Sequence, residues 1–249
     1  IFGEGGADRI GSFSGDDTVT GGTGDDIIWL DSTYDELGNL TSAAQVDHGN
    51  DTANWSTGDG ADDIYGESGN DLVNIDLDLG AGVIPVAGLF IDLDGPASDT
   101  NNRDVVDFQV SGAATATFEY LSSTVANVDV TGLGGTVDIN NTETIQYTGD
   151  AADDDDIVIL GVAGADDDIT IAPTGSDSAL IFNGGDPWDG PTEGAWDDQY
   201  PGMAGGAAGP DINIIAGLSA SSITVDGNGA SVGGSDQRSE EHTSELQSL

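Results

Sequence analysis

Hydrophobic and polar residues alternate along this chain in very short units. Within residues 1–79 one apolar position recurs at intervals of nine, with one long break and one slip of two residues; the six apolar residues are Ile10, Val19, Ile28, Ala53, Ile64 and Val73. A single aliphatic residue between polar neighbours predicts a strand of about three residues with one side chain in a core. No stretch carries an apolar repeat at helical spacing over three turns, so we predict an all-β chain.

Glycine and aspartate occupy fixed places in the same nine-residue windows. The windows begin at residues 3, 12, 21, 46, 57 and 66. Their fourth places hold Gly6, Gly15, Gly24, Gly49, Gly60 and Gly69, and their sixth places hold Asp8, Asp17, Asp26, Asp51, Asp62 and Asp71. Glycine adopts left-handed backbone angles at little steric cost, so the first six residues of each window predict a turn. Stacked turns would place the carboxylates in rows beside backbone carbonyls, and such oxygens are the ligands that Ca²⁺ prefers.

This pattern resembles the nonapeptide repeat of the RTX, or haemolysin-type calcium-binding, proteins, which reads GGxGxDxUx with U a large apolar residue. The resemblance covers residues 1–79 and implies a right-handed parallel β-roll whose successive windows lie on alternate sides. It also implies that each Ca²⁺ lies between turns of adjacent coils, held by backbone carbonyls and by the sixth-place aspartate. The leading glycine pair is complete only at Gly21 and Gly22, which is typical of a diverged member.

The resemblance further implies which aspartates come together. The expected neighbours are Asp8 with Asp26 and Asp51 with Asp71, with Asp62 on the edge opposite the second pair. Asp17 is expected on the edge opposite Asp8, where an insertion removes its successor.

The insertion comprises residues 30–45, in which the nine-residue register is lost. It predicts either a hairpin or loop pushed out of the stack, or a degenerate pair of repeats. Its acidic residues Asp31, Asp35 and Glu36 either lie in a solvated loop or add a cation site.

From residue 80 onward, short alternating runs continue with Gly, Asn or Asp between them. We predict that residues 80–237 extend the β-roll as a β-solenoid with longer coils. The alternative is a separate β-sandwich beginning near Ala81. Two acidic turns look like worn windows with Asp155 and Asp167 at the sixth place, and they either bind calcium or are solvated.

Residues 184–210 contain four prolines and many glycines, and the segment is too long for an ordinary connection. Trp188, Trp196 and Tyr200 lie there among several aspartates. Aromatic rings beside carboxylates either bind a sugar or pin a long loop to its scaffold.

Composition narrows the classes of function. The chain has 47 acidic residues, no lysine and three arginines, giving a net charge of −44. This balance excludes a nucleic-acid surface and disfavours anionic lipid. No apolar run reaches the roughly 20 residues of a membrane span. Without cysteine or lysine, and with only two histidines, nucleophilic triads and His-based zinc sites lack their residues. We therefore predict that this segment is not an enzyme.

Residues 238–248 match the in-frame translation of a common sequencing-library adapter, so we leave 238–249 out of the fold prediction. The alternative is a true amphipathic C-terminal tail. The chain is interpreted as a fragment of a larger protein.

These observations predict a calcium-binding structural or adhesive segment of a secreted or cell-surface bacterial protein. Its folding is expected to couple to Ca²⁺ after export, and the resemblance implies type I secretion. Partners are calcium ions and an extracellular polysaccharide or surface ligand. The alternative is a carbohydrate-active or carbohydrate-binding β-helix domain.

Overall fold

The computed structural model describes residues 1–34, 40–42, 49–79, 88–93, 103–121, 125–130, 135–150, 155–161, 168–174, 178–183, 211–216, 223–226 and 237–239. Within these residues the chain forms twenty β-strands and no α-helix, which confirms the all-β prediction. Accordingly, none of the described segments is a helix that could cross a lipid bilayer.

Most strands belong to two nine-stranded sheets. The first has the spatial order β1 (Arg9–Gly11), β3 (Ile27–Trp29), β7 (Asp63–Tyr65), β9 (Leu89–Asp92), β13 (Thr136–Asn140), β12 (Val125–Val130), β11 (Thr115–Tyr120), β15 (Asp156–Leu160) and β19 (Ile223–Asp226). The second has the order β2 (Thr18–Thr20), β6 (Thr52–Ser56), β8 (Leu72–Asp78), β10 (Val105–Ser111), β14 (Thr144–Thr148), β18 (Asp211–Ala216), β17 (Ala179–Asn183), β16 (Asp168–Pro173) and β20 (Gln237–Ser239).

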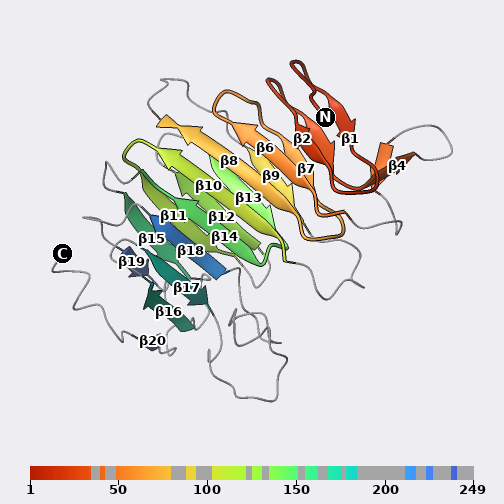
Figure 1. Cartoon of the computed structure of the whole chain (residues 1–249). Helices are drawn as coiled ribbons and strands as arrows, with labels where there is room; N and C mark the ends of the chain where they lie inside the picture. The colour runs from red at the N-terminus through yellow and green to blue at the C-terminus, as the bar shows by residue number, and fades with distance from the viewer. Residues whose placement is uncertain are drawn as a thin grey trace, which may run out of the picture.

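The chain alternates between the two sheets from β1 to β10, apart from one hairpin, and each strand pairs in parallel with its predecessor in the same sheet. The register keeps equivalent places of the windows in line: Ile10 pairs with Ile28, which pairs with Ile64. Figure 1 shows the resulting stack, with the N-terminal strands in red at one end and the C-terminal strands in teal and blue at the other.

The insertion forms an antiparallel hairpin of β4 (Ser32–Tyr34) and β5 (Leu40–Ser42), outside both large sheets. Of the alternatives for residues 30–45, the hairpin pushed out of the stack is the one that the described residues show. Figure 1 places β4 beside the N-terminal end of the stack. The chain then re-enters the second sheet at β6, which pairs directly with β2.

Both sheets continue across residue 80, because β9 pairs with β7 and β10 pairs with β8. Later strands thus extend the same two sheets and do not start new ones. The sheets are not wholly parallel, however. β11, β12 and β13 pair in antiparallel fashion within the first sheet, and β16, β17 and β18 do so within the second. A purely parallel continuation is therefore wrong for these six strands.

The hydrophobic core thickens from the N-terminal end inward. β1, β2 and β3 each bury one side chain, contributed by Ile10, Val19 and Ile28. β8 and β10 each bury three, and these include Leu77 and Phe108. Because hydrophobic stabilisation scales with buried apolar area, the first coils gain much less from packing than the middle of the chain does.

The second place of each described repeat turn has a left-handed backbone. Gly22 and Gly58 fill it with φ of 91° and 104°, whereas Glu4, Phe13 and Glu67 adopt φ of 73°, 70° and 74°. A side chain in this region costs roughly 1–2 kcal/mol. The conformation explains why the resembled repeat places glycine there, and the three non-glycine residues store strain.

We expect Glu67→Gly to be more stable than Glu67→Ala by about 1 kcal/mol, because alanine retains the Cβ that opposes a left-handed backbone. Chemical denaturation of both variants in excess Ca²⁺ measures the difference. The two variants remove the same charge, so charge cannot account for it. Ser14 lacks a positive φ, so there Ser14→Ala should be more stable than Ser14→Gly. A more stable glycine variant at both positions would contradict the proposed strain.

Candidate metal centre

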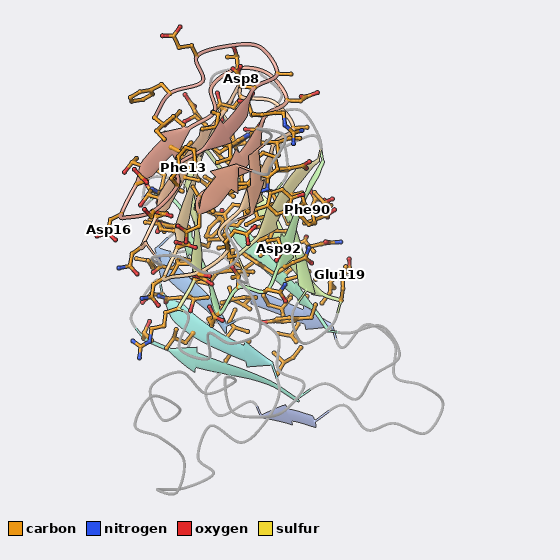
Figure 2. All side chains as sticks on the ribbon, turned by 90° about the vertical axis from the view of Figure 1, so that its right-hand side faces the viewer. Asp8, Phe13, Asp16, Phe90, Asp92 and Glu119 are labelled. Carbon is orange, nitrogen blue, oxygen red and sulfur yellow. The ribbon has the colours of Figure 1, made fainter. Side chains whose placement is uncertain are left out.

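The sixth-place aspartates lie where each turn enters its strand, in two rows. Turns that lead into the first sheet carry Asp8, Asp26 and Asp62; those that lead into the second carry Asp17, Asp51 and Asp71. Because the connections are short, the start of a strand in one sheet lies beside the end of a strand in the other, so the rows occupy opposite edges. Figure 2 shows Asp8 of the first row apart from Asp16, which directly precedes Asp17 of the second row.

Each carboxylate binds the backbone of the preceding coil. The N–H of Asp8 donates to Oδ1 of Asp26 at 2.8 Å, and the N–H of Asp26 donates to Oδ1 of Asp62 at 2.8 Å. On the second edge, the N–H of Asp17 donates to Oδ1 of Asp51 at 2.7 Å, and the N–H of Asp51 donates to Oδ1 of Asp71 at 2.9 Å. The expected pairs Asp8–Asp26 and Asp51–Asp71 are thus confirmed as neighbours, and Asp62 lies opposite the second pair.

The expectation for Asp17 is wrong. Its successor is not lost to the insertion, because the hairpin loops out and the register resumes with Asp51 above Asp17. The insertion splits a turn without shifting the strand that follows it. Nothing in the residue spacing distinguishes this in-phase return from the loss of a coil.

The second carboxylate oxygen has no such partner. Oδ2 of Asp8, Asp26, Asp51 and Asp71 is buried and makes no hydrogen bond. The side chains of Asp26, Asp51 and Asp71 are each only 1% exposed. Oδ2 faces back over its own turn, since a Cβ added to Gly66 would lie 2.6 Å from Oδ2 of Asp71 and one added to Gly3 would lie 3.2 Å from that of Asp8. An unpaired buried charge is costly, so these atoms fit a bound cation.

The fourth-place glycines form two columns beside these carboxylates. A Cβ on Gly24 would meet the carbonyl of Gly6, and one on Gly60 would meet that of Gly24. On the other edge a Cβ on Gly49 would meet the carbonyl of Gly15, and one on Gly69 would meet that of Gly49. Close approach of successive turns therefore requires glycine at Gly24, Gly49, Gly60 and Gly69. Gly6 and Gly15 have open space around them, and their φ values of 117° and 102° favour glycine instead. The carbonyl of each lower turn faces the turn above, which provides oxygen atoms between coils.

A second set of bonds involves the fifth place of the windows, which the sequence analysis overlooked. Oδ1 of Asp16 accepts the N–H of Asn50 at 2.9 Å, and Oδ1 of Asn50 accepts that of Asn70 at 3.0 Å. Oδ1 of Asp25 accepts the N–H of Ala61 at 3.0 Å. These bonds run in the opposite direction to those of the sixth place. The signal was present, because the fifth place holds only Asp, Asn or Ala.

The carboxylate row on the second edge continues beyond the repeats. The N–H of Asp71 donates to Oδ1 of Asp104 at 2.7 Å, and that of Asp104 donates to Oε2 of Glu143 at 2.6 Å. On the first edge, Ala114 donates to Oδ1 of Asp155 at 2.8 Å, so this worn window keeps the same bond. The sequence analysis missed Asp104 and Glu143, because no glycine turn of recognisable spacing precedes them.

Burial makes these carboxylates unusually basic. Desolvation outweighs a backbone hydrogen bond and, together with the charges of neighbouring carboxylates, raises the pKa of Asp51 and of Asp62 to about 7. Desolvation likewise raises the pKa of Asp71 to about 8, with the charges of Asp51 and Asp31 adding to the effect. The pKa of Asp26 is also raised, chiefly by burial. A cation bound at Oδ2 would reverse these shifts by favouring the ionised form.

The carboxylates alone do not make a complete metal site. Within the described residues, no three acidic or histidine side chains converge as they do where side chains alone bind the metal. A Ca²⁺ ion takes six to eight oxygens, so the remaining ligands would be turn carbonyls or water. Asp35, Glu36, Asp167 and the aromatic residues of 184–210 lie outside the described residues. The adapter-like residues are described only at 238 and 239, within β20.

Comparisons of the chain with protein-family models, with curated proteins and with solved structures each found no match. The resemblance to RTX repeats thus depends on the residues and spacings given above.

We expect stability in the presence of a chelator to fall as the pH rises from about 5 to 9. In the unfolded chain these carboxyls ionise near pH 4, whereas Asp51, Asp62 and Asp71 retain protons in the folded state to about pH 7 or 8. The folded state therefore binds more protons over this interval, and its stability decreases with pH. Thermal unfolding in chelator at a series of pH values tests this. Saturating Ca²⁺ should flatten the decrease, and stability that rises with pH in chelator would contradict it.

Proposed function

We propose that residues 1–79 form a Ca²⁺-binding, right-handed parallel β-roll of the RTX type, which continues as a β-solenoid. In this proposal the chain is a structural or adhesive segment of a larger secreted or cell-surface bacterial protein. The observation that carries it is the set of buried Oδ2 atoms of Asp8, Asp26, Asp51 and Asp71, which lack hydrogen bonds. Hydrogen bonding between coils uses only Oδ1, so an uncharged asparagine would serve that purpose as well.

Counter-charge for these carboxylates is scarce in the protein itself. Arginine provides the three basic residues other than histidine, and Arg9 stacks over the ring of Trp29 at 4.8 Å from its centroid. The first coils also bury only one apolar side chain per strand, so packing does little to offset the repulsion. A bound divalent cation supplies both the missing charge and the link between coils.

The oxygen environment favours Ca²⁺ over Mg²⁺. Carboxylate oxygens and turn carbonyls approach from different coils with spacings fixed by the β ladder. Ca²⁺ accepts variable numbers of ligands at 2.3–2.6 Å, whereas Mg²⁺ requires a compact octahedron and loses water reluctantly. The stacked turns offer an irregular arrangement, which suits the larger ion.

Location follows from affinity in this proposal. Extracellular calcium modules bind with dissociation constants near 10⁻⁴–10⁻³ M, so such sites stay empty in a cytosol and fill outside the cell. The chain would therefore remain unfolded during synthesis and fold after export, and the RTX resemblance suggests type I secretion as the route.

An adhesive role remains part of the proposal, whereas carbohydrate binding gains no specific support from the described residues. The half-buried aromatic rings of the first sheet pack on one another: Trp29 and Tyr65 are stacked with centroids 6.0 Å apart, and Tyr65 lies 5.8 Å from Phe90. Figure 2 shows Phe90 at the side of this sheet. Arg9 covers the end of the row at Trp29, so no open ring face is left there for a sugar. The absence of enzymatic activity stays a prediction.

The decisive experiment compares Asp71→Asn with the wild type in chelator and in 10 mM Ca²⁺ at pH 8. Asparagine keeps the Oδ1 acceptor but removes the charge, so in chelator the variant should be at least as stable as the wild type. In Ca²⁺ the wild type should gain about 2–3 kcal/mol for each site filled at roughly a hundredfold excess, and the variant should lose that gain. Circular dichroism during urea unfolding measures both states.

Asp76→Asn is the matched control, since Asp76 is exposed on β8 and its loss removes the same charge. Equal behaviour of the two variants would attribute the effect to net charge alone. A wild-type β spectrum and stability that do not change between chelator and Ca²⁺ would overturn the proposed function.

Calcium dependence should be local, because the core is thin only near the N-terminal end. The amide of Ile27, which donates to the carbonyl of Asp8 at 2.9 Å, should lose protection from hydrogen exchange by about a hundredfold in chelator. The amide of Thr144, which donates to Asp104 at 3.1 Å beside the thick core, should change by less than about tenfold. Equal loss at both amides would show that the ion stabilises the whole chain as one unit.

A further inference from the structure

The outward face of the first sheet carries aromatic rings and carboxylates in alternation. Asp63 and Tyr65 lie two residues apart on β7, and Phe90 and Asp92 lie two residues apart on β9. The residues between them are buried in the core, so these four side chains face outward. The β ladder pairs Asp63 with Phe90 and Tyr65 with Asp92. Rings and carboxylates therefore alternate at the four corners of one patch, which we call the β7–β9 patch.

The four side chains are close enough to contact one ligand group. The ring centroids of Tyr65 and Phe90 are 5.8 Å apart, with the ring planes inclined at 54°. Neighbouring strands lie about 4.8 Å apart, so each ring has a carboxylate beside it on the next strand. Burial, and then the charges of Asp63 and Asp92, raise the pKa of the Tyr65 hydroxyl, in agreement with this placement. Figure 2 shows Phe90 and Asp92 on the same side of the molecule.

Arg9 provides an internal example of a ligand on this face. Trp29 pairs with Tyr65 in the same ladder, and their rings stack with centroids 6.0 Å apart and planes 16° from parallel. The guanidinium of Arg9 lies over the Trp29 ring, 4.8 Å from its centroid. A guanidinium is planar and weakly hydrated, and it is attracted by the negative face of an aromatic ring. One end of the aromatic row is thus occupied by a guanidinium of the chain itself.

The chain has few other cations to offer the rest of the row. It contains no lysine, and its remaining arginines are Arg103, which precedes β10, and Arg238, which lies in β20. Both of these strands belong to the second sheet. A further guanidinium on the β7–β9 patch would therefore come from another molecule.

The two carboxylates of the patch can accept hydrogen bonds from such a group. Asp92 accepts one bond through Oδ1, from Nδ2 of Asn141 at 2.9 Å. The side chain of Asp63 makes no hydrogen bond or ion pair within the described part of the chain. All four side chains of the patch are half-buried, and contacts between a cation, a ring and a carboxylate are stronger there than in open water. Arginine suits this arrangement better than lysine, because it stacks on a ring and donates N–H groups in the same plane.

We propose that the β7–β9 patch binds arginine side chains of a basic polypeptide. Each guanidinium stacks on Tyr65 or Phe90 while its N–H groups donate to Asp63 or Asp92. This inference deepens the adhesive part of the proposed function by naming a partner, and it rests on that part for an external ligand. The net charge of −44 also attracts a basic partner over longer distances.

The test compares a dye-labelled hexa-arginine peptide with a hexalysine peptide, each titrated with the whole chain in 10 mM Ca²⁺ and followed by fluorescence anisotropy. The two peptides carry the same charge, so attraction to the acidic chain alone binds them equally. The wild type should bind hexa-arginine at least about fivefold more tightly than hexalysine, because only arginine stacks well on the rings.

Variants then locate the preference. The double variant Tyr65→Leu/Phe90→Leu keeps the charge and an apolar side chain but removes both rings, so the preference for arginine should fall below about twofold. Phe2→Leu is the matched control, since Phe2 is 78% exposed and bridges to Thr20 of the second sheet. It should leave the preference unchanged. Asp63→Asn should weaken hexa-arginine binding about threefold more than Asp76→Asn, which removes the same charge from β8 of the second sheet.

The outcomes separate this inference from the calcium sites. Equal binding of the two peptides, or an unchanged preference in the double variant, would overturn the patch. The circular dichroism response of the same wild-type sample to Ca²⁺ tests the calcium sites independently, so either proposal can fail while the other stands. If the double variant does not fold, the comparison of Asp63→Asn with Asp76→Asn decides, and equal weakening by both would overturn the patch.

Discussion

The hydrogen bond from the backbone N–H of one sixth-place aspartate to the carboxylate of the next is the contact on which the N-terminal stack depends. At this point the chain leaves the turn and begins the strand, and backbone carbonyls alone do not complete the ladder. The carbonyl of Asp8 accepts from Ile27 while its N–H is satisfied by Asp26, and the same exchange recurs at Asp51 and Asp71. A short side chain with an acceptor is required, and aspartate places that acceptor one rung beyond the strand.

Aspartate serves this purpose at an electrostatic cost. Only Oδ1 is used, and the charge is delivered with Oδ2 into a buried position where desolvation raises the pKa. Asparagine would make the same backbone bond without a charge, and Asn50 does so at the exposed fifth place. The presence of aspartate at all six sixth-place positions, four of them buried, therefore needs a reason beyond hydrogen bonding. The cation proposed between the turns would supply one, because it would convert the unfavourable oxygen into a ligand.

The sequence was sufficient to predict what depends on spacing alone. The fixed places of Gly, Asp and an aliphatic residue specify the short strands, the two columns of glycines and the neighbours Asp8–Asp26 and Asp51–Asp71. The sequence was insufficient where the outcome depends on the place at which the chain re-enters a sheet after an irregular segment. The successor of Asp17 could not be identified, because a hairpin that closes on itself leaves no trace in linear spacing. Asp104 and Glu143 follow irregular segments of different length, so no period reveals them, and the antiparallel strands β12 and β17 have the same alternation as parallel ones.

The N-terminal coils and the strands from β8 onward differ in how much apolar surface they bury. The connection between them explains how a strained, acidic stack can exist. Glu4, Phe13 and Glu67 hold left-handed angles that favour glycine, and β1 and β2, which follow the first two, bury only one side chain each. From β8 to β15 each strand buries two or three side chains, with Phe108, Phe118 and Tyr147 among them, and these build a thicker core. The hydrogen bonds from Asp71 to Asp104 and from Asp104 to Glu143 join the N-terminal coils to the thicker core along one edge. The thick core thus presents a β edge on which the thinner coils stack, and the proposed cation would neutralise the carboxylates of those coils.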